Sequence, residues 1–387
     1  MKVALVYYSF FNPLIFRDAG AHLERGDEVD VICYARPDEQ NEIHHKGLNI
    51  YRMLQREYDE KCASNYLLKI CHFFFLATIK ILILQLKRRY DMIYVISPPD
   101  FMVFVGMIPR LLGTKIIMNI HDIVPEFYMR KFKVNDNHVI IKILKIIEKV
   151  CCRFSSHVFT VTDIWQDKLI KRTGISHSKC SVIMNVPDDK LVELAKKNKT
   201  PRSSCFRLLY PGNLGEHFGV ETLIRAMPLL KEEIPSIELD IYGDGLRKEY
   251  LREIAKRLGV QGIINFNKII PIEELLVSMR KADIGIVPTL NGVFAGEALS
   301  TKSLEFLAVG TPMIISRTTS TQYYYDDSMV MFFKPGDHYD LARCIIELYK
   351  DHDQRKAQVQ NAEQFNKKHN WEHYKRIYLG TVDNLVS

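Results

Sequence analysis

Two glutamates and a lysine lie close together in the second half of the chain. Glu297 and Glu305 are eight positions apart, and Lys302 lies between them. Carboxylates accept hydrogen bonds from hydroxyl groups, and a lysine ammonium binds phosphate. The three residues could therefore bind one molecule that carries both hydroxyl groups and an anion.

The flanking sequence indicates how these side chains are positioned. Residues 282–288 read as a short buried strand, and apolar residues recur at helical spacing over 302–308, where Gly310 and Pro312 end the helix. Residues 313–315 read as a further strand. Glu297 would lie in a strand-end loop, and Lys302 in the first helical turn, where backbone amides favour an anion such as a diphosphate. Glu305, one to two turns further in, could accept hydrogen bonds from a ribose diol.

This arrangement resembles the Glu-x7-Glu motif of the retaining glycosyltransferases of family 4. In that family an Ala-x-Gly-x-Pro sequence follows the second glutamate, and residues 308–312 have this pattern. The resemblance implies a GT-B fold and a nucleotide diphosphate sugar, with a UDP-sugar as the expected donor. It also implies that Glu297 positions the donor sugar and that Glu305 holds the ribose. The alternative is a pair of solvated glutamates, since glutamate is mostly exposed.

The chain predicts an α/β fold of two Rossmann-like domains facing a cleft. Its 387 residues favour two cores, and buried strand patterns alternate with helical ones in both halves. We expect an N-terminal acceptor-binding domain over 1–187, a nucleotide-sugar-binding domain over 188–365 and a crossover helix over 366–387 that packs on the N-terminal domain. The lysine-rich residues 190–202 read as a linker.

The first half contributes a histidine and two strand-end loops. His121 ends a predicted strand over 115–120, at a position that resembles the family-4 histidine that contacts the donor sugar. The loop after the first strand lacks the Gly-Gly pair found in many relatives, so we expect it to shape the acceptor site. Two prolines make the loop after residues 92–96 rigid. The predicted acceptor-side residues are Phe10, Phe11, Asn12, Pro99 and Asp100.

The loop after the strand predicted over 206–210 departs from the family pattern. Relatives usually have Gly-Arg and Lys-Gly there, but this chain has Gly212-Asn213 and Phe218-Gly219. Lys302 could supply a missing charge from the other side, and His217 another if protonated. The turn at Gly243 and the segment 263–271 resemble the family's Gly-x-Gly turn and base-stacking loop. The predicted donor-binding residues are Gly212, Asn213, His217, Gly243, Lys268, Ile270, Ala298, Leu299, Ser300, Leu304 and Glu305, and the predicted catalytic residues are His121, Glu297 and Lys302.

All of the net charge lies in the first half. Residues 1–187 hold 26 Lys and Arg and 19 Asp and Glu, whereas residues 188–387 hold 27 of each. Residues 66–86 are strongly apolar but interrupted by charges, which favours a core helix or a helix that lies on a membrane over a span. A basic amphipathic helix over 138–154 is typical of contact with anionic lipid. We expect a cytoplasmic protein, peripheral at the inner face of the cell membrane, that does not bind nucleic acid.

Two further features limit the chemistry. The eight cysteines form no Cys-x-x-Cys pair and Met1-Lys2 leads straight into a strand, which predicts a reducing compartment without a signal peptide. No Asp-x-Asp follows a predicted strand, so we expect neither a metal nor another cofactor.

The motifs around 210–215 and 301–305 are most similar to those of transferases of bacterial surface polysaccharide assembly, which act on lipid-diphosphate acceptors. We expect a metal-independent enzyme that moves a sugar to a hydroxyl of a lipid-linked or glycan acceptor. A nucleotide-sugar 2-epimerase on the same fold remains an alternative. So does a non-catalytic nucleotide- or glycan-binding module, because both usual basic contacts are missing.

Overall fold

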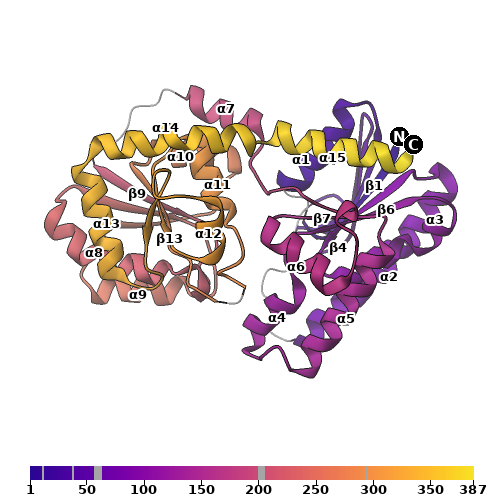
Figure 1. Cartoon of the computed structure of the whole chain (residues 1–387), viewed down its shortest axis with the longest axis horizontal. Helices are drawn as coiled ribbons and strands as arrows, with labels where there is room; N and C mark the ends of the chain where they lie inside the picture. Colours follow the sequence, from indigo (N-terminus) through magenta and orange to yellow (C-terminus); the bar gives the residue numbers. More distant parts are fainter. Residues whose placement is uncertain (11–12, 37–38, 56–62, 199–204, 293) are drawn as a thin grey trace. The chain divides into compact units, whose positions relative to one another are not determined.

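The computed structural model describes residues 1–10, 13–36, 39–55, 63–198, 205–292 and 294–387. They form two compact units, one of residues 1–184 and 374–387 and the other of residues 185–373 (Figure 1). Both units are α/β with mainly parallel sheets, which is the predicted fold class.

The first unit contains an eight-stranded sheet. Its strand order is β3-β4-β2-β1-β5-β6-β7-β8, and only β3 runs antiparallel to its neighbour. The strands are β1 (Lys2–Phe10), β2 (Glu28–Ala35), β3 (Glu42–His45), β4 (Leu48–Gln55), β5 (Met92–Ser97), β6 (Lys115–Ile120), β7 (His157–Thr160) and β8 (Cys180–Val182). The central strands are continuous apolar runs that are buried on both faces, as helices on both sides of a parallel sheet require.

Helices cover both faces of this sheet (Figure 1). They are α1 (Pro13–Glu24), α2 (Ala63–Arg88), the 3-10 segment η1 (Asp100–Gly106), α3 (Met107–Leu111), α4 (Val124–Phe132), α5 (Val139–Phe154), α6 (Asp163–Thr173), the short η2 (His177–Lys179) and the C-terminal α15 (Trp371–Val386). Helix α15 is anchored by Tyr378, which is 1% exposed and whose hydroxyl lies 2.8 Å from His22 Nε2 on α1.

The second unit contains a six-stranded parallel sheet in the order β11-β10-β9-β12-β13-β14. The strands are β9 (Phe206–Pro211), β10 (Ile237–Tyr242), β11 (Ile264–Asn267), β12 (Ile284–Val287), β13 (Met313–Ser316) and β14 (Met331–Phe333). This is the doubly wound order: strands are added outward from β9 to β11, and the chain then returns to place β12 on the other side of β9. We call the point between β9 and β12 the reversal. Ligands of such sheets bind at the carboxyl ends of the strands beside that reversal.

The helices of the second unit pack in two groups. α8 (Val220–Glu233) packs against α9 (Lys248–Arg257) and α13 (His338–Lys350), while α10 (Ile272–Lys281) packs against α7 (Asp189–Lys197) and α11 (Thr301–Val309). The remaining helical segments are η3 (Glu216–Phe218), η4 (Gln261–Ile263), α12 (Thr319–Tyr324) and α14 (His352–Lys368). The core contains buried side chains of α8, α9 and α13 together with those of the strands.

Two boundaries differ from the sequence-based expectation. Most of the expected linker is helix α7, because Asp188 caps its first turn and Val192 and Ala195 face inward. The expected crossover helix over 366–387 is two elements, because residues 366–368 end α14. There the Asn366 amide donates to the Leu307 carbonyl, which ties α14 to α11 in the second unit.

Candidate active site

Helix α11 begins at the carboxyl edge of the second sheet, beside the β9–β12 reversal. Its N-cap residue, Ser300, makes no side-chain hydrogen bond to the helix, while Ser303 Oγ donates to the Ser300 carbonyl at 2.6 Å. The first-turn amides carry the positive end of the helix dipole. The start of α11 is therefore able to attract an anion.

Lys302 crosses from α11 to the loop that follows β9. A Cβ added to Gly212 would lie 2.4 Å from Lys302 Cε, so the lysine stem occupies the space that a side chain at position 212 would need. Lys302 Nζ lies 4.4 Å from the centre of the Phe218 ring and 5.5 Å from that of Tyr210. The structure thus brings the Lys302 ammonium beside Gly212 and Phe218, in the loop where the family resemblance leads one to expect basic side chains.

Glu305 lies one turn after Lys302 on the same helix face. Burial raises the pKa of Glu305 to about 7, and Lys302 partly offsets that rise. Burial also lowers the pKa of Lys302 to about 8, and Glu305 partly offsets that fall. At a pH between these two pKa values, Glu305 is a carboxylate and Lys302 an ammonium. Binding of a diol and an anion requires these two charge states.

Close backbone approach fixes the loops that follow β9 and β10. A Cβ on Gly243 would lie 1.8 Å from the carbonyl oxygen of Gly212, and the Gly212 amide donates to the Tyr242 carbonyl at 2.7 Å. Gly212 itself has a φ of +117°, which few other residues adopt. Both glycines are needed for the two loops to meet, and this contact places Gly212 under Lys302.

The motif loop before α11 is fixed by backbone contacts. The Glu297 and Ala298 amides donate to the Phe294 carbonyl at 3.2 and 2.9 Å. Ser320 on α12 donates its hydroxyl to the Ala298 carbonyl at 3.1 Å and its amide to Gly296 at 2.9 Å. Glu297, Ala298, Leu299 and Ser300 are half-buried along this loop.

The other predicted donor residues divide into two groups. Near Lys302, Asn213 Oδ1 accepts from the Gly215 amide at 2.7 Å, and the His217 ring lies 3.9 Å from the Phe218 ring. After β11, Lys268 is exposed and Ile270 is half-buried, and within the described part of the chain neither forms a hydrogen bond or ion pair with Lys302. Leu304 is 4% exposed and serves packing of the helix.

The first unit presents a different constellation at its own strand ends. The Asn119 amide nitrogen lies 2.9 Å from His121 Nε2 and 2.5 Å from the Tyr94 hydroxyl, which lies 3.3 Å from Asp18. Asp18 in turn accepts from Arg17 at 2.9 Å. Burial, with a smaller contribution from Arg17, lowers the pKa of His121 to about 3. The imidazole is therefore neutral, and the donated Asn119 N–H places its proton on Nδ1.

The predicted acceptor-side residues that the structure describes are buried or half-buried. Asp100 is buried and accepts a hydrogen bond from the Ser97 hydroxyl, and burial raises the pKa of its carboxyl to about 6. Phe10 is buried, whereas Pro99 is half-buried. Phe11 and Asn12 lie outside the described residues.

Three contributors were not identified from the sequence. The rings of Tyr210 and Phe218 enclose the Lys302 ammonium, and Asn119 orients His121. Of the two rings, the Tyr210–Gly215 motif could have pointed only to Tyr210. Asn119 could have been found because it lies two residues before the strand-end His121, and side chains two residues apart share one face of a strand.

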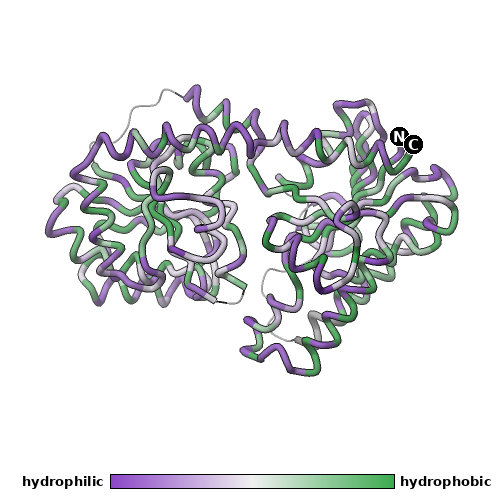
Figure 2. The backbone as a smooth tube through the Cα atoms, in the orientation of Figure 1, coloured by the Kyte–Doolittle hydropathy of each residue, from purple (hydrophilic) through white to green (hydrophobic). Residues whose placement is uncertain are grey.

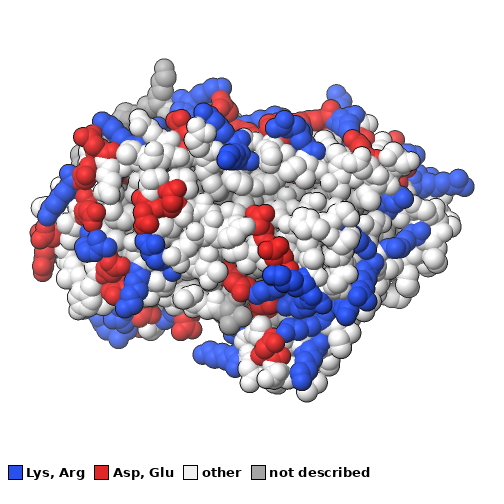
Figure 3. Space-filling model, viewed as in Figure 1, with Lys and Arg blue, Asp and Glu red and all other residues white. Residues whose placement is uncertain are grey.

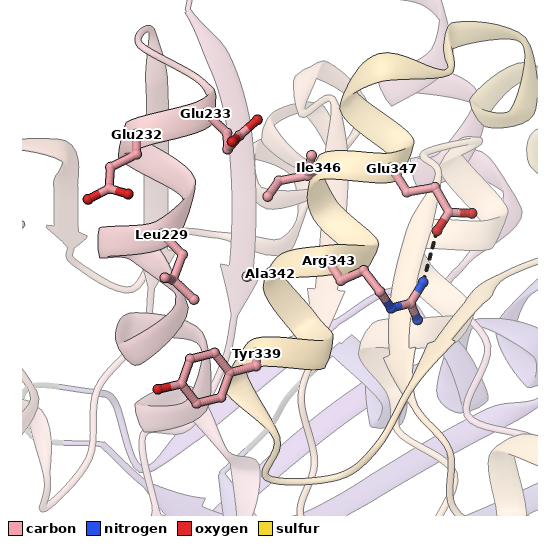
Figure 4. A pocket seen from close by; sticks show the side chains of 8 residues that line it. All are labelled: Leu229, Glu232, Glu233, Tyr339, Ala342, Arg343, Ile346 and Glu347. Atoms are coloured by element: carbon pink, nitrogen blue, oxygen red, sulfur yellow. Dashed lines mark hydrogen bonds and ion pairs between the residues drawn. The ribbon is translucent and has the colours of Figure 1, made fainter.

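Two other kinds of site receive less support. Within the described residues no group of three or more His, Cys, Asp or Glu side chains gathers as metal ligands would. A hollow between α8 and α13 is lined by Glu232, Glu233, Tyr339 and neighbouring residues, with Arg343 bonded to Glu347 at 2.9 Å (Figure 4). It contains none of the predicted site residues.

Comparisons with known proteins follow the two units. Residues 19–190 match the model of "Glycosyltransferase Family 4", and residues 192–365 match that of "Glycosyl transferases group 1". Glycogen synthase of Mycobacterium tuberculosis is 28% identical over 170 residues, which cover 44% of this chain and 39% of that protein. A GDP-mannose-dependent phosphatidylinositol monomannoside mannosyltransferase of Mycolicibacterium smegmatis is 35% identical over 102 residues, 26% of this chain and 27% of that one. The chain thus matches about two fifths or less of the length of these curated relatives.

Solved structures agree on the fold. Sucrose-phosphate synthase of Thermosynechococcus elongatus has a TM-score of 0.77 at 17% identity and covers 99% of this chain and 98% of its own. HepE of Anabaena, in complex with UDP, has a TM-score of 0.69 at 17% identity over 99% of this chain and 100% of its own. The chain therefore has the two-domain GT-B fold, as predicted.

Proposed function

The chain belongs to glycosyltransferase family 4, and we propose that it transfers a sugar from a nucleotide diphosphate sugar to a hydroxyl group. The observation that carries this proposal is the position of Lys302. Its ammonium lies at the start of α11, over Gly212 and beside Phe218, with Glu305 one turn further along. This arrangement offers a cation and helix amides to a diphosphate and a carboxylate to a ribose.

A UDP-sugar is the donor we infer. HepE, which shares the fold, is described in complex with UDP. We assign base contact to the loop after β11, which holds Lys268 and Ile270, and ribose contact to Glu305. The mannosyltransferase relative is named for GDP-mannose, so a purine donor is the competing outcome of a donor panel.

The reaction we propose retains the anomeric configuration. The bond between the sugar's anomeric carbon and the diphosphate breaks, and the acceptor oxygen forms its bond on the same face. The acceptor's proton passes to a departing phosphate oxygen. Glu297 positions the donor sugar, neutral His121 contacts it as a hydrogen-bonding group, and Lys302 with the α11 amides stabilises the leaving group. No metal is assigned a role, because these groups already offset the developing charge.

The acceptor we infer is a lipid-linked or glycan hydroxyl in surface polysaccharide synthesis at the inner face of the cell membrane. Two observations support it. The first half carries all of the net charge of +7, and one relative is named for a phosphatidylinositol mannoside acceptor.

The test is a panel of labelled nucleotide sugars incubated with the purified chain and membrane lipids. We expect label in the lipid fraction with one donor, an unchanged anomeric configuration by NMR, and undiminished activity in EDTA. Chelator-sensitive turnover rescued by Mg²⁺ or Mn²⁺ would contradict the metal-independent mechanism. Epimerised donor without transfer would establish the 2-epimerase instead. Donor binding without any turnover would establish a binding module, the function that the missing basic residues at Asn213 and Phe218 favour.

A further inference from the structure

The first unit exposes far more apolar surface than the second. Among the described residues, 22 large hydrophobic side chains are exposed, and 15 of them lie between Leu68 and Val150. The second unit has six. Concentrated apolar exposure of this kind marks a contact with a protein or a membrane.

Helix α2 is apolar on two opposite faces. Its inner stripe packs on β1 and β4 of the sheet, and its outer stripe is exposed. The inner residues are Ile70, Phe73, Ala77, Ile81 and Leu84, and the outer ones Leu68, Phe75, Ile79, Ile83 and Leu86. In the described part of the chain, α2 is the one helix long and apolar enough to cross a membrane, yet 33% of that stretch is buried. Crossing would strip the inner stripe from the sheet, so α2 can meet lipid only along its length.

Two further helices extend this surface. Helix α5 buries Ile141 and Cys151 but exposes apolar side chains along the opposite side, and α3 exposes most of its length. The exposed residues are Met107, Ile108, Leu111 and Leu112 at α3 and Val139, Ile140, Ile143, Ile146 and Val150 on α5. The spacing of the α5 residues is that of one helix face.

The three helices are neighbours. Segment η1 packs against both α2 and α5, with Phe101 5.6 Å from Phe74 and Phe104 5.0 Å from Phe154, ring centre to ring centre. The Arg110 guanidinium of α3 lies 4.7 Å from the same Phe154 ring. Figures 1 and 2 show α2 and α5 close together, both largely hydrophobic. We call this set of exposed residues on α2, α3 and α5 the apolar face.

Positive charge surrounds this face. Residues 107–154 hold nine Lys and Arg but four Asp and Glu. Two of those acids, Glu126 and Glu148, are buried and bind Arg172 at 2.7 and 2.6 Å. Lys142 and Lys149 are exposed on α5 beside the apolar stripe. Figure 3 shows Lys and Arg gathered over α4 and α5.

We propose that the apolar face rests on a lipid bilayer with anionic headgroups. The outer side chains of α2, α3 and α5 enter the boundary of the acyl region, and the lysines meet lipid phosphates. A protein partner fits less well, since protein interfaces are depleted in lysine, whereas lysine beside aliphatic residues is the composition of membrane-surface helices. The inference deepens the proposed function and rests on it only for the acceptor, which a bilayer would present.

The chain offers a matched pair for the test. Ile146 on α5 and Leu194 on α7 are each 62% exposed, and Leu194 belongs to the second unit. Full-length wild type, Ile143→Asp/Ile146→Asp and Leu194→Asp are compared by flotation with vesicles of phosphatidylglycerol and phosphatidylcholine and with phosphatidylcholine alone. A Lys142→Gln/Lys149→Gln variant keeps the apolar stripe and provides a second measurement if the aspartates unfold α5.

We expect wild type and Leu194→Asp to bind the anionic vesicles and the double aspartate variant to bind at least ~10-fold more weakly. Loss of two lysines should weaken binding by about 10-fold or more, and high salt should weaken the wild type without abolishing its binding. Equal binding by all variants, equal binding to neutral vesicles, or none to either would overturn the proposal. So would a wild-type dimer that the aspartates dissociate.

Calorimetry with UDP separates this inference from the proposed function. Every folded variant should bind UDP as the wild type does, because none alters the predicted donor residues. Wild type that binds vesicles but not UDP or any other nucleotide would refute the function and leave the membrane surface standing. Wild type that binds UDP but no vesicle would refute the membrane surface and leave the proposed donor binding standing.

Discussion

The carboxyl edges of the two sheets follow parallel strands in both units, but different groups fill them. In the second unit, glycines let backbone meet backbone, so that Gly243 touches Gly212 and Lys302 fills the space above it. In the first unit, side chains fill the edge, and a buried chain of polar groups ends at His121. In the second unit, small residues leave room beside the helix amides and one cation, which are groups that favour an anion. In the first unit, the edge holds a neutral side chain in a fixed orientation.

Removal of the Lys302 ammonium should have the largest effect on the second edge. Lys302→Ala should reduce the rate of transfer by about 10²–10³, because the leaving-group charge is largest in the transition state. Donor affinity should fall less than the rate. Steady-state kinetics with titrated donor measures both, and Lys231→Ala, an exposed lysine on α8, serves as control. Turnover within a few-fold of wild type would show that Lys302 is only a packed first-turn lysine.

Removing the Glu305 carboxylate tests the second charged group at the edge that holds Lys302. Glu305→Ala should weaken donor binding by about 1.5–3 kcal/mol, the value of a hydrogen bond to a charged group. Glu305→Gln should lose less, since the amide oxygen still accepts a bond from a hydroxyl. Isothermal calorimetry with the nucleotide measures the binding affinity of each variant. Unchanged affinity in a folded Glu305→Ala protein would end the assignment of ribose binding.

The first unit's edge is tested through Asn119 rather than His121 itself. In Asn119→Asp the carboxylate should accept a hydrogen bond from Nε2–H, whereas Asn119 donates one, and so raise the pKa of His121 from about 3 towards neutrality. We expect roughly tenfold slower transfer at near-unchanged donor affinity, because the imidazole that we propose contacts the sugar would no longer be neutral. An NMR titration of His121 is the readout that a purely structural role would not move. A histidine that still titrates near pH 3 would show that Asn119 does not govern it.

The smallest expected effect is the pH dependence of wild type. Glu305, with a raised pKa of about 7, is an ionised acceptor above that pH, and Lys302, with a lowered pKa of about 8, is a cation below that pH. Activity should therefore peak near pH 7.5 and fall about 2–3-fold one unit to either side. Lys302→Arg should remove the alkaline decline, since guanidinium stays charged. A flat profile in wild type would contradict the coupling of the two groups.

Much of the fold followed from local pattern. Continuous apolar strands such as β1 and β6, and the ends of α11 at Ser300 and Gly310, were predicted within a residue or two, since parallel strands and capped helices have strong local signals. Helix α7 was misread as linker, because its apolar positions are only Val192 and Ala195 among lysines. The β3–β4 hairpin was missed, since β3 is exposed and polar.

Local pattern was enough to predict a two-domain α/β fold and to place Glu297, Lys302 and Glu305 on one loop and the helix after it. The folded structure was needed to show that Lys302 lies over Gly212 and Phe218, ninety and eighty-four positions away in the chain. It also decided that α2 and α5 each keep an exposed apolar side. The physical reason is that local spacing fixes which face a residue occupies, whereas what lies opposite that face depends on elements distant in sequence.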